Sequence, residues 1–283
     1  MSLTVNAALT QAIAALREAG IEGAATDARR LMAAALGADG SRLSLVGPDT
    51  LEPDQSALLQ AYVTARLSRQ PVAQIIGKRA FYGRDFKVTA DVLDPRPETE
   101  TLVDIALSAP FETVLDVGTG SGCILVTLLA EVPNARGEGV DLSARALDVA
   151  QENARWHAVA ERAVFYRSDY LGAVTGPYDL IVSNPPYIAA REMADLSPEV
   201  REWEPHLALT PGTDGLAAYR VLAAQAAQFL NETGRIVVEI GYAQGADVCA
   251  LFKQAMWDRV TLHADLNGHD RVVSAVKSAS QLL

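Results

Sequence analysis

The sequence is poor in cysteine, and this scarcity excludes several classes of protein. Its 283 residues include two cysteines, Cys123 and Cys249, which are too few and too far apart for a disulfide framework or a zinc site. The four histidines show no spacing typical of metal ligands. We therefore expect neither a metal centre nor a fold held together by disulfides.

Long apolar runs are also missing. No stretch approaches the roughly 18 apolar residues of a membrane span, and the N-terminus lacks the basic-then-apolar pattern of a secretory signal. With 49% hydrophobic residues, the chain can still bury the core of one large domain and a smaller one. We expect a cytoplasmic protein with no membrane partner.

Positive charge is scarce, and it is distributed unevenly. The formal net charge is −11, with +2 on residues 1–84 and −13 on the remainder. Binding a phosphate backbone requires a basic footprint, so stable nucleic-acid binding is disfavoured. An acidic surface suits a basic protein partner, or one that itself binds RNA, as well as it suits plain solubility.

The hydrophobic pattern changes twice along the chain. Residues 4–19, 25–37 and 53–70 have helical periodicity, and the short alternating pieces that follow predict a β-hairpin connector. From Glu98 onward helix and strand alternate, as in a parallel sheet covered on both faces. We expect helices at 98–109, 121–131, 143–157, 216–231 and 244–254, and strands at 112–117, 135–140, 163–167, 178–183, 234–240, 258–263 and 270–276.

A glycine-rich loop follows the first of these strands. Gly118, Thr119, Gly120, Ser121 and Gly122 separate the strand from a helix. Alternate glycines allow a sharp turn and let a ligand approach the backbone closely, and free N–H groups at the helix start favour an anion. The G-x-G-x-G spacing differs from the G-x-G-x-x-G dinucleotide fingerprint.

The next two strands also end in polar residues. Asp141 lies about twenty residues beyond the glycines, where a carboxylate holds a ribose diol in nucleoside-binding folds; Leu142 follows it. The alternative role for Asp141 is to cap the following helix, which Ser143 can also do. Asp169 and Tyr170 are placed to contact an adenine, or they form a plain turn at a strand end. NAD and S-adenosylmethionine enzymes share this ribose recognition.

The fourth strand leads into Asn184, Pro185, Pro186 and Tyr187. Two consecutive prolines hold a rigid turn and leave nearby carbonyl groups free to accept hydrogen bonds. With the Asn184 side-chain oxygen, these carbonyls can grip a planar –NH2 group, and Tyr187 offers a ring for stacking or packing. The alternative is a proline turn that only closes the strand, but the ligand-binding pattern upstream favours a catalytic role.

These motifs resemble those of the release-factor glutamine methyltransferase family, the HemK/PrmC type, over nearly the full length. The most specific segment is the Pro-Arg-Pro-Glu-Thr-Glu run in front of the glycine loop. Asp94 stands where the family usually has an apolar residue, and Tyr170 where tryptophan is common. The matching segments are 94–100, 116–122, 141–143, 168–170, 184–188, 203–205, 208–209, 212–216 and 265–271.

The resemblance implies an α/β fold with a seven-stranded Rossmann-like methyltransferase sheet. It also implies S-adenosyl-L-methionine as cofactor and N5 methylation of the glutamine in the Gly-Gly-Gln loop of class I peptide-chain release factors. The expected domains are a helical substrate-docking domain at 1–70, the connector at 71–95 and the methyltransferase domain at 96–283. The expected catalytic residues are Asn184, Pro185, Pro186 and Tyr187, and the expected cofactor-binding residues are Gly118, Thr119, Gly120, Ser121, Gly122, Asp141, Leu142, Asp169, Tyr170 and Asn184.

Several alternatives remain open on the sequence. The Asn-Pro-Pro-Tyr turn also occurs in enzymes that methylate amino groups of nucleic acids, and a non-catalytic scaffold would bind cofactor or partner without turnover. Residues 188–215 form a lid over the target group or a surface excursion. Arg96 and Glu98 shape the cofactor pocket or only favour a helix start.

Overall fold

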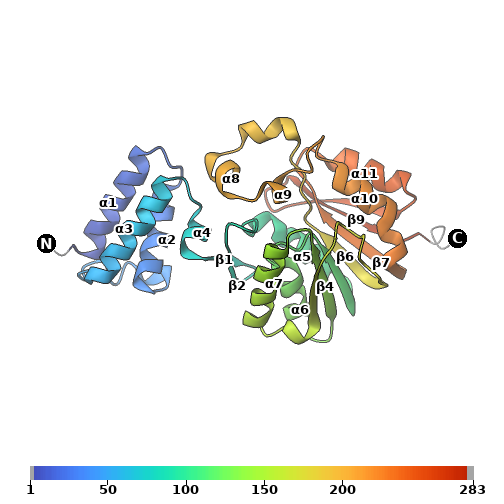
Figure 1. Ribbon diagram of the computed structural model, residues 1–283, viewed down its shortest axis with the longest axis horizontal. Helices are drawn as coiled ribbons and strands as arrows, with labels where there is room; N and C mark the ends of the chain where they lie inside the picture. The colour runs from blue at the N-terminus through green and yellow to red at the C-terminus, as the bar shows by residue number, and fades with distance from the viewer. Residues whose placement is uncertain (1–2, 279–283) are drawn as a thin grey trace. The chain divides into compact units, whose positions relative to one another are not determined.

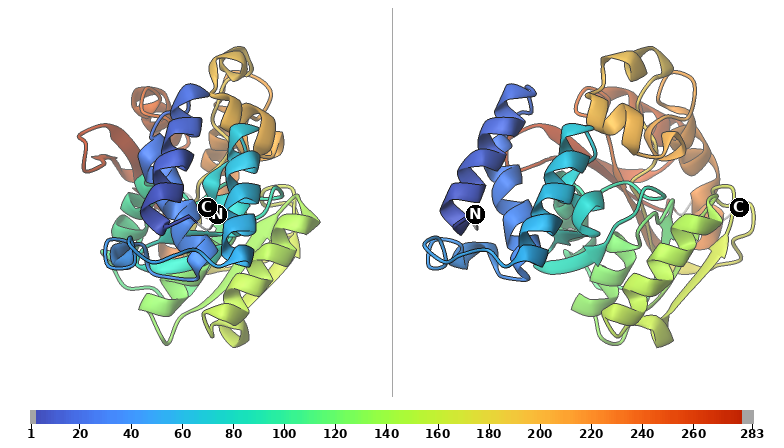
Figure 2. Two further views of the ribbon diagram at one scale, coloured as in Figure 1. Left: turned by 90° about the vertical axis from the view of Figure 1, so that its left-hand side faces the viewer. Right: turned by 60° about the vertical axis from the view of Figure 1, so that its left-hand side comes forward.

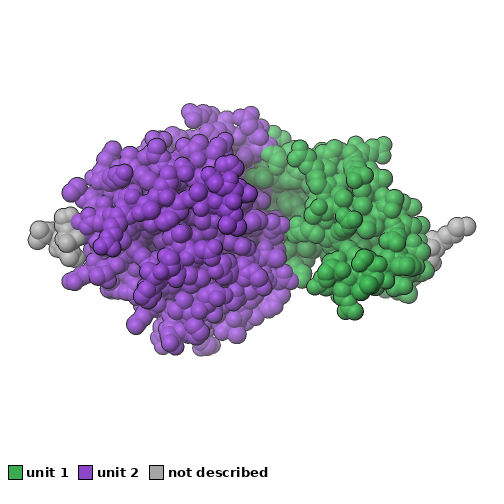
Figure 3. Space-filling model, turned by 180° about the vertical axis from the view of Figure 1, so that it is seen from behind, with its two compact units in different colours: residues 1–78, 197–203 green, residues 79–196, 204–283 purple. Residues whose placement is uncertain are grey.

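The computed structural model describes residues 3–278, which form two compact units. One unit contains the chain up to Lys78 together with Ser197–Trp203, and the other contains Arg79–Leu196 and the chain from Glu204 onward (Figure 3). Buried apolar side chains form separate clusters in the two units. Across residues 3–278, every helix is too short or too polar to be a membrane span.

The first unit is helical, as the periodicity predicts (Figure 2). Thr4 caps the first helix by accepting a hydrogen bond from the Ala7 N–H, and Leu16 on its apolar face is fully buried. The unit consists of α1 (Val5–Glu18), α2 (Ala24–Leu36), the 3-10 turn η1 (Gly40–Arg42), α3 (Pro53–Leu67), α4 (Val72–Ile76) and α8 (Pro198–Trp203).

Helix α8 is distant in sequence from the rest of its unit, and a buried arginine holds it there. Arg66 Nε lies 2.8 Å from Asp27 Oδ2, and its Nη2 lies 3.0 Å from Glu199 Oε1. The Trp203 indole N–H donates to the Ser68 carbonyl over 3.1 Å. Breaking a buried ion pair is costly because it leaves an uncompensated charge, so these contacts fix α8 in the first unit.

The second unit starts with the expected hairpin and continues into a seven-stranded sheet. The hairpin strands are β1 (Lys78–Phe81) and β2 (Arg84–Lys87), with Phe81 and Phe86 buried. The sheet order is β5-β4-β3-β6-β7-β9-β8, parallel from β5 to β7 and antiparallel at β9 and β8. The strands are β3 (Thr113–Val117), β4 (Arg136–Asp141), β5 (Ala163–Arg167), β6 (Tyr178–Ser183), β7 (Leu230–Glu239), β8 (Asp258–Ala264) and β9 (Asp270–Val276).

Helices cover both faces of the sheet, so its central strands are apolar on both sides. In β6, Leu180 and Val182 join the cluster under α5, α6 and α7, while Ile181 joins the cluster under α10 and α11 (Figure 1). The fold class expected from the sequence is thereby confirmed. The helices are α5 (Glu100–Leu107), preceded by the 3-10 turn η2 (Pro97–Thr99), α6 (Cys123–Glu131), α7 (Ala144–Trp156), with the 3-10 turn η3 (Ala160–Arg162) after it, α10 (Ala217–Gln225) and α11 (Gly245–Gln254).

Two segments differ from the sequence prediction. The helix expected over 216–231 ends at Gln225, continues as the 3-10 turn η5 (Ala226–Phe229), and gives way to β7 at Leu230, because Leu230 pairs with Tyr178 of β6. Residues 188–215, where no helix or strand is expected from the sequence, contain the 3-10 turn η4 (Ala190–Asp195), α8 and α9 (His206–Leu209). These elements are 6, 6 and 4 residues long, which is too short for a hydrophobic period to be recognised in the sequence.

Candidate functional site

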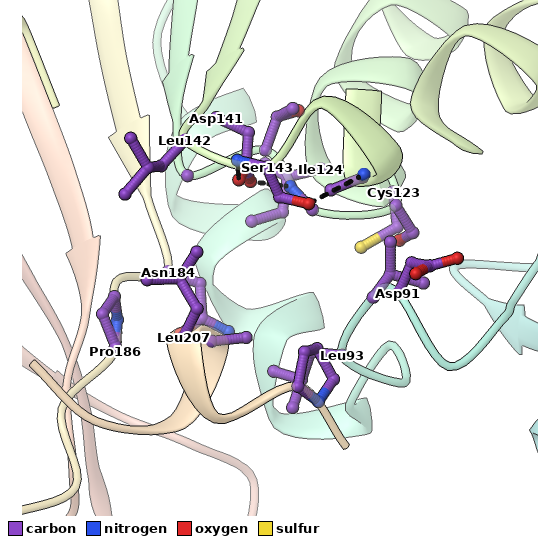
Figure 4. A pocket seen from close by; sticks show the side chains of 18 of the residues that line it. Asp91, Leu93, Cys123, Ile124, Asp141, Leu142, Ser143, Asn184, Pro186 and Leu207 are labelled. Carbon is purple, nitrogen blue, oxygen red and sulfur yellow. Dashed lines mark hydrogen bonds between the residues drawn. The ribbon is translucent and has the colours of Figure 1, made fainter. Parts of the chain in front are cut away.

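A cavity of about 400 Å³ lies in the second unit at the carboxyl ends of the central strands. This size falls in the usual range for small-molecule sites, and the place is where open α/β sheets bind ligands. Figure 4 shows Asn184, Pro186 and Leu207 on one side of it and Asp141, Leu142 and Ser143 on another. The lining comes from residues 90–96, Thr99, 118–121, Cys123, Ile124, 141–143, Ala146, 168–170, Asn184, Pro186, Pro205, 207–208 and 210–211. Gly122, also expected to bind the cofactor, is not among the lining residues.

The glycine loop adopts the backbone conformation that its sequence predicts. Gly118, Gly120 and Gly122 all have positive φ, a region that side chains disfavour. At Gly122 an added Cβ would also press against Ala150 of α7. The glycines therefore allow the sharp turn between β3 and α6 and bring backbone groups of Gly118 and Gly120 to the cavity.

Asp116, near the end of β3, is buried next to this loop and is hydrogen-bonded to it. Its Oδ2 accepts a hydrogen bond of 2.7 Å from the Thr119 hydroxyl, and both side chains are buried. Burial raises the pKa of Asp116 to about 7, although the Thr119 hydrogen bond opposes the shift. Asp116 belongs to a matching segment of the sequence, but the sequence alone assigns it no role. The structure indicates that it holds the glycine loop in place through Thr119.

Asp141 reaches the cavity from the end of β4 and is held in place by the backbone. Its Oδ2 accepts from the Gly120 N–H and its Oδ1 from the Ser143 N–H, each over 2.9 Å. The cap of α7 is Ser143, whose hydroxyl accepts from the Ala146 N–H. Each Asp141 oxygen keeps a lone pair, so the carboxylate can still accept two hydroxyl groups.

The remaining expected cofactor contacts also line the cavity. Leu142 is 38% exposed there, Asp169 is exposed, and Tyr170 is half-buried with a positive φ of 47°. Burial raises the pKa of the Tyr170 hydroxyl. An apolar side chain, a carboxylate and an aromatic ring so placed fit a flat heterocycle with exocyclic donors.

The Asn-Pro-Pro-Tyr turn is divided between the cavity and the core. Asn184 and Pro186 line the cavity, whereas Pro185 is buried. Tyr187 packs against the core cluster under α10 and α11, and burial raises its pKa to about 12. Sequence reasoning grouped the four as catalytic; the structure brings two of them to the cavity wall and places the Tyr187 ring in a packing position.

Arg96 and Glu204 form an ion pair at the cavity edge that the sequence does not predict. The Arg96 Nη2 lies 2.7 Å from both carboxylate oxygens of Glu204, whose side chain is only 1% exposed. Burial raises the pKa of Glu204 to about 7 even though Arg96 opposes the shift. The pair fixes the chain where it re-enters the second unit, beside the cavity-lining Pro205.

Hydrogen bonds between the two ends of the segment 188–215 hold these ends together in a narrow neck. The Ile188 N–H donates to the Leu209 carbonyl and the Ala190 N–H to the Thr213 carbonyl, over 3.0 and 2.9 Å. The Gln244 amide closes the neck by donating to the Tyr187 carbonyl over 3.0 Å. Because the neck begins at the Asn-Pro-Pro-Tyr turn, the geometry of the turn and that of the segment are linked.

The cavity therefore fits a nucleoside ligand at one end and an amino group at the other. The carboxylate of Asp141 suits a diol, the exposed loop backbone suits a zwitterionic tail, and Asn184 offers an amide to a second molecule. Because Asn184 lines the same cavity as the ligand site, the arrangement suits direct transfer of a group between the two.

Comparisons with known proteins agree with this geometry. Residues 7–77 match the family described as "PrmC N-terminal domain", and residues 91–199 match "Methyltransferase small domain". The chain is 56% identical to the release factor glutamine methyltransferase of Cereibacter sphaeroides over 95% of this chain and 96% of that one. It is 43% identical to the protein of the same name from Caulobacter vibrioides, with 98% of both chains covered. A methyltransferase structure from Pyrococcus furiosus is similar with a TM-score of 0.54 at 15% identity, covering 77% of this chain and 98% of that one, and it supports the fold.

Proposed function

This chain belongs to the release factor glutamine methyltransferase family, and from that premise we propose that it methylates the side-chain amide nitrogen of a glutamine in a protein substrate. The methyl donor is S-adenosyl-L-methionine. The single observation that supports this most directly is that Asn184 lines the same cavity as Asp141 and the glycine loop. The donor site and the acceptor-binding amide thus share one cavity.

The residues present fit the donor. Asp141 would hold the ribose hydroxyls, Leu142, Asp169 and Tyr170 would contact the adenine, and the loop backbone would hold the methionine portion. When bound, the cofactor supplies an electrophilic sulfonium methyl group, so no side chain has to form a covalent intermediate. The protein contributes binding and orientation.

The acceptor chemistry explains the choice of an asparagine. An amide nitrogen is a poor nucleophile, because its lone pair is delocalised into the carbonyl. Asn184 Oδ1 and the Pro185 carbonyl would accept hydrogen bonds from the two N–H groups of the substrate –NH2, which aims the nitrogen and stabilises positive charge as the bond to carbon forms. As that bond forms, the bond between the methyl group and the sulfur breaks, and one amide proton is released. Tyr187 and Pro186 hold this geometry by packing and by restricting the turn.

The names of the relatives support a release factor as the protein substrate. We propose class I peptide-chain release factors, with the glutamine of their Gly-Gly-Gln loop entering beside Asn184. The helical unit, proposed as a docking domain over residues 1–70, would bind the body of the factor. The cytoplasm, where translation terminates, would be the place of action, with no stable nucleic-acid or membrane partner.

A radiolabelled methyl-transfer assay tests this proposal with three acceptors. These are a purified class I release factor, the same factor with its Gly-Gly-Gln glutamine replaced, and mixed DNA and RNA. We expect label on the intact factor alone. Label on nucleic acid would instead identify a nucleic-acid amino methyltransferase, and cofactor binding without label on any acceptor would identify a scaffold.

A further inference from the structure

The amide of Asn184 can face the cavity in two orientations, and only one is useful. Its oxygen and nitrogen are nearly identical in size, but one accepts hydrogen bonds and the other donates. A substrate –NH2 group offers only donors. A flipped Asn184 would turn its own N–H groups toward the substrate N–H groups, and no hydrogen bond could form. The proposed function, on which this inference rests, therefore needs something that fixes the amide.

The first contact that bears on this is with Thr99. Asn184 Nδ2 lies 3.2 Å from Thr99 Oγ1, and Thr99 is only 2% exposed, at the end of the 3-10 turn η2. A hydroxyl both donates and accepts. Thr99 alone therefore tolerates either amide orientation.

The second contact removes that freedom. Glu239, at the end of β7, is 1% exposed, and its carboxyl is near enough to the Thr99 hydroxyl for that hydroxyl to lower its pKa, against the larger effect of burial. Ser183 is paired with Val238 across β6 and β7, so Asn184 and Glu239 follow at adjacent strand ends. Above about pH 7, where the Glu239 carboxyl is ionised, it can only accept, so the Thr99 proton goes to Glu239 and the Thr99 lone pairs remain for an Asn184 donor.

We propose that Thr99 and Glu239 are positioning residues that fix the Asn184 amide with its nitrogen toward Thr99 and its oxygen toward the substrate. Neither residue touches the reacting atoms in this scheme. The direction of the hydrogen bonds runs from Asn184 through Thr99 to Glu239. The role is specific to asparagine, because a side chain with two acceptor oxygens would need no such orientation.

Thr99→Val tests this role, because valine keeps the shape and removes the hydroxyl. We expect kcat for the release factor to fall about tenfold, the scale of one net hydrogen bond, with cofactor Kd and substrate KM within about threefold. Thr99→Ser keeps the hydroxyl and should restore kcat. Glu239→Leu should lower kcat in the same sense, and combining it with Thr99→Val should add little, because both break one chain of bonds.

The decisive comparison repeats Thr99→Val in the N184D background. A carboxylate presents an acceptor in either orientation, so the loss in kcat should shrink to about twofold or less. An equal loss in both backgrounds would show that Thr99 acts only through local packing and would overturn the inference. An unchanged kcat for Thr99→Val with Asn184 intact would overturn it as well.

A nuclear magnetic resonance measurement separates this inference from the proposed function. In 15N-labelled protein the Asn184 side-chain amide, assigned by its absence in N184D, should exchange with solvent at least tenfold faster in Thr99→Val than in wild type or Thr99→Ser. Equal exchange in all three would overturn the inference. This readout requires no turnover, whereas lack of methyl transfer by the wild-type enzyme to a release factor would count against the proposed function alone.

Discussion

At the scale of single residues, Asn184 carries the proposed chemistry with one side-chain oxygen. Asn184→Ala removes that acceptor, and we expect the single-turnover rate of methyl transfer to fall about 10²–10³-fold, as when one preorganised group is lost. Asn184→Asp keeps an acceptor and should retain clearly more activity than the alanine variant. An alanine variant near the wild-type rate would refute the assignment.

Asp141 and Ser143 form a natural pair for separating cofactor binding from helix capping. Asp141→Ala should weaken cofactor binding about 10- to 100-fold, because hydrogen bonds to a charged group are lost. Ser143→Ala removes the cap of α7 and should cost about 1 kcal/mol of stability with little change in cofactor Kd. Calorimetry measures the cofactor Kd of both variants, and thermal unfolding measures their stability. Loss of stability without a change in Kd for Asp141→Ala would show that Asp141 acts as a helix cap.

At the scale of elements, the neck of residues 188–215 depends on Gln244. Its Nε2 donates to Tyr187 and Gly215, and its Oε1 accepts from the Gly241 N–H. Gln244→Ala should cost roughly 1–3 kcal/mol of unfolding free energy and lower kcat more than it changes cofactor Kd, because the neck joins the Asn184 turn. Gln244 precedes α11 at its N-cap, and Gln254 is exposed at the other end of that helix; Gln254→Ala is therefore the matched control and should change neither.

The same segment, residues 188–215, contributes residues to both units. Its α8 portion belongs to the helical unit through Arg66 and Glu199, and its later part lines the cavity through Pro205 and Leu207. A shortened segment lacking residues 192–202 should keep cofactor affinity and lose turnover if the segment covers the target group. Unchanged turnover, measured by the same methyl-transfer assay, would contradict that role.

At the scale of the whole molecule, three buried carboxyl groups set the pH dependence of stability. Burial raises the pKa of Asp116, Glu204 and Glu239 to about 7 each, from 3.8, 4.5 and 4.5. Between about pH 4 and pH 7 the folded protein thus binds more protons than the unfolded chain, so its stability falls as the pH rises through this window. Thermal unfolding should show a decrease in Tm from pH 5 to pH 8.

Glu239→Gln provides the check on that prediction. A neutral side chain removes one titrating group, so the decrease in Tm with rising pH should become shallower. The Tm of the variant relative to that of the wild type should therefore be higher at pH 8 than at pH 5. Glu98, Arg96 and Arg271 also act on the Glu239 carboxyl and remain unchanged in this variant. Parallel curves for the two proteins would show that Glu239 is ionised alike in both states.

Much of the fold can be predicted from the sequence, because hydrophobic periodicity and the glycines and prolines that end an element are local properties. The apolar runs of β3 and β6 are buried on both faces, and each is followed by the glycines or prolines that end it. The strand ends predicted as ligand sites converge because parallel strands place their carboxyl ends at one edge. Asp141 and Asn184 are brought to one cavity in this way.

Only the tertiary structure decided the remainder, because it depends on contacts between distant segments. The sequence does not indicate that α8 joins the helical unit through Arg66, or that the buried Glu204 pairs with Arg96. It contains Thr99 and Glu239 without relating them to Asn184, 85 and 55 positions away. The sequence by itself determined which groups are available at the strand ends, whereas packing determined which of them are buried, paired and able to orient one another.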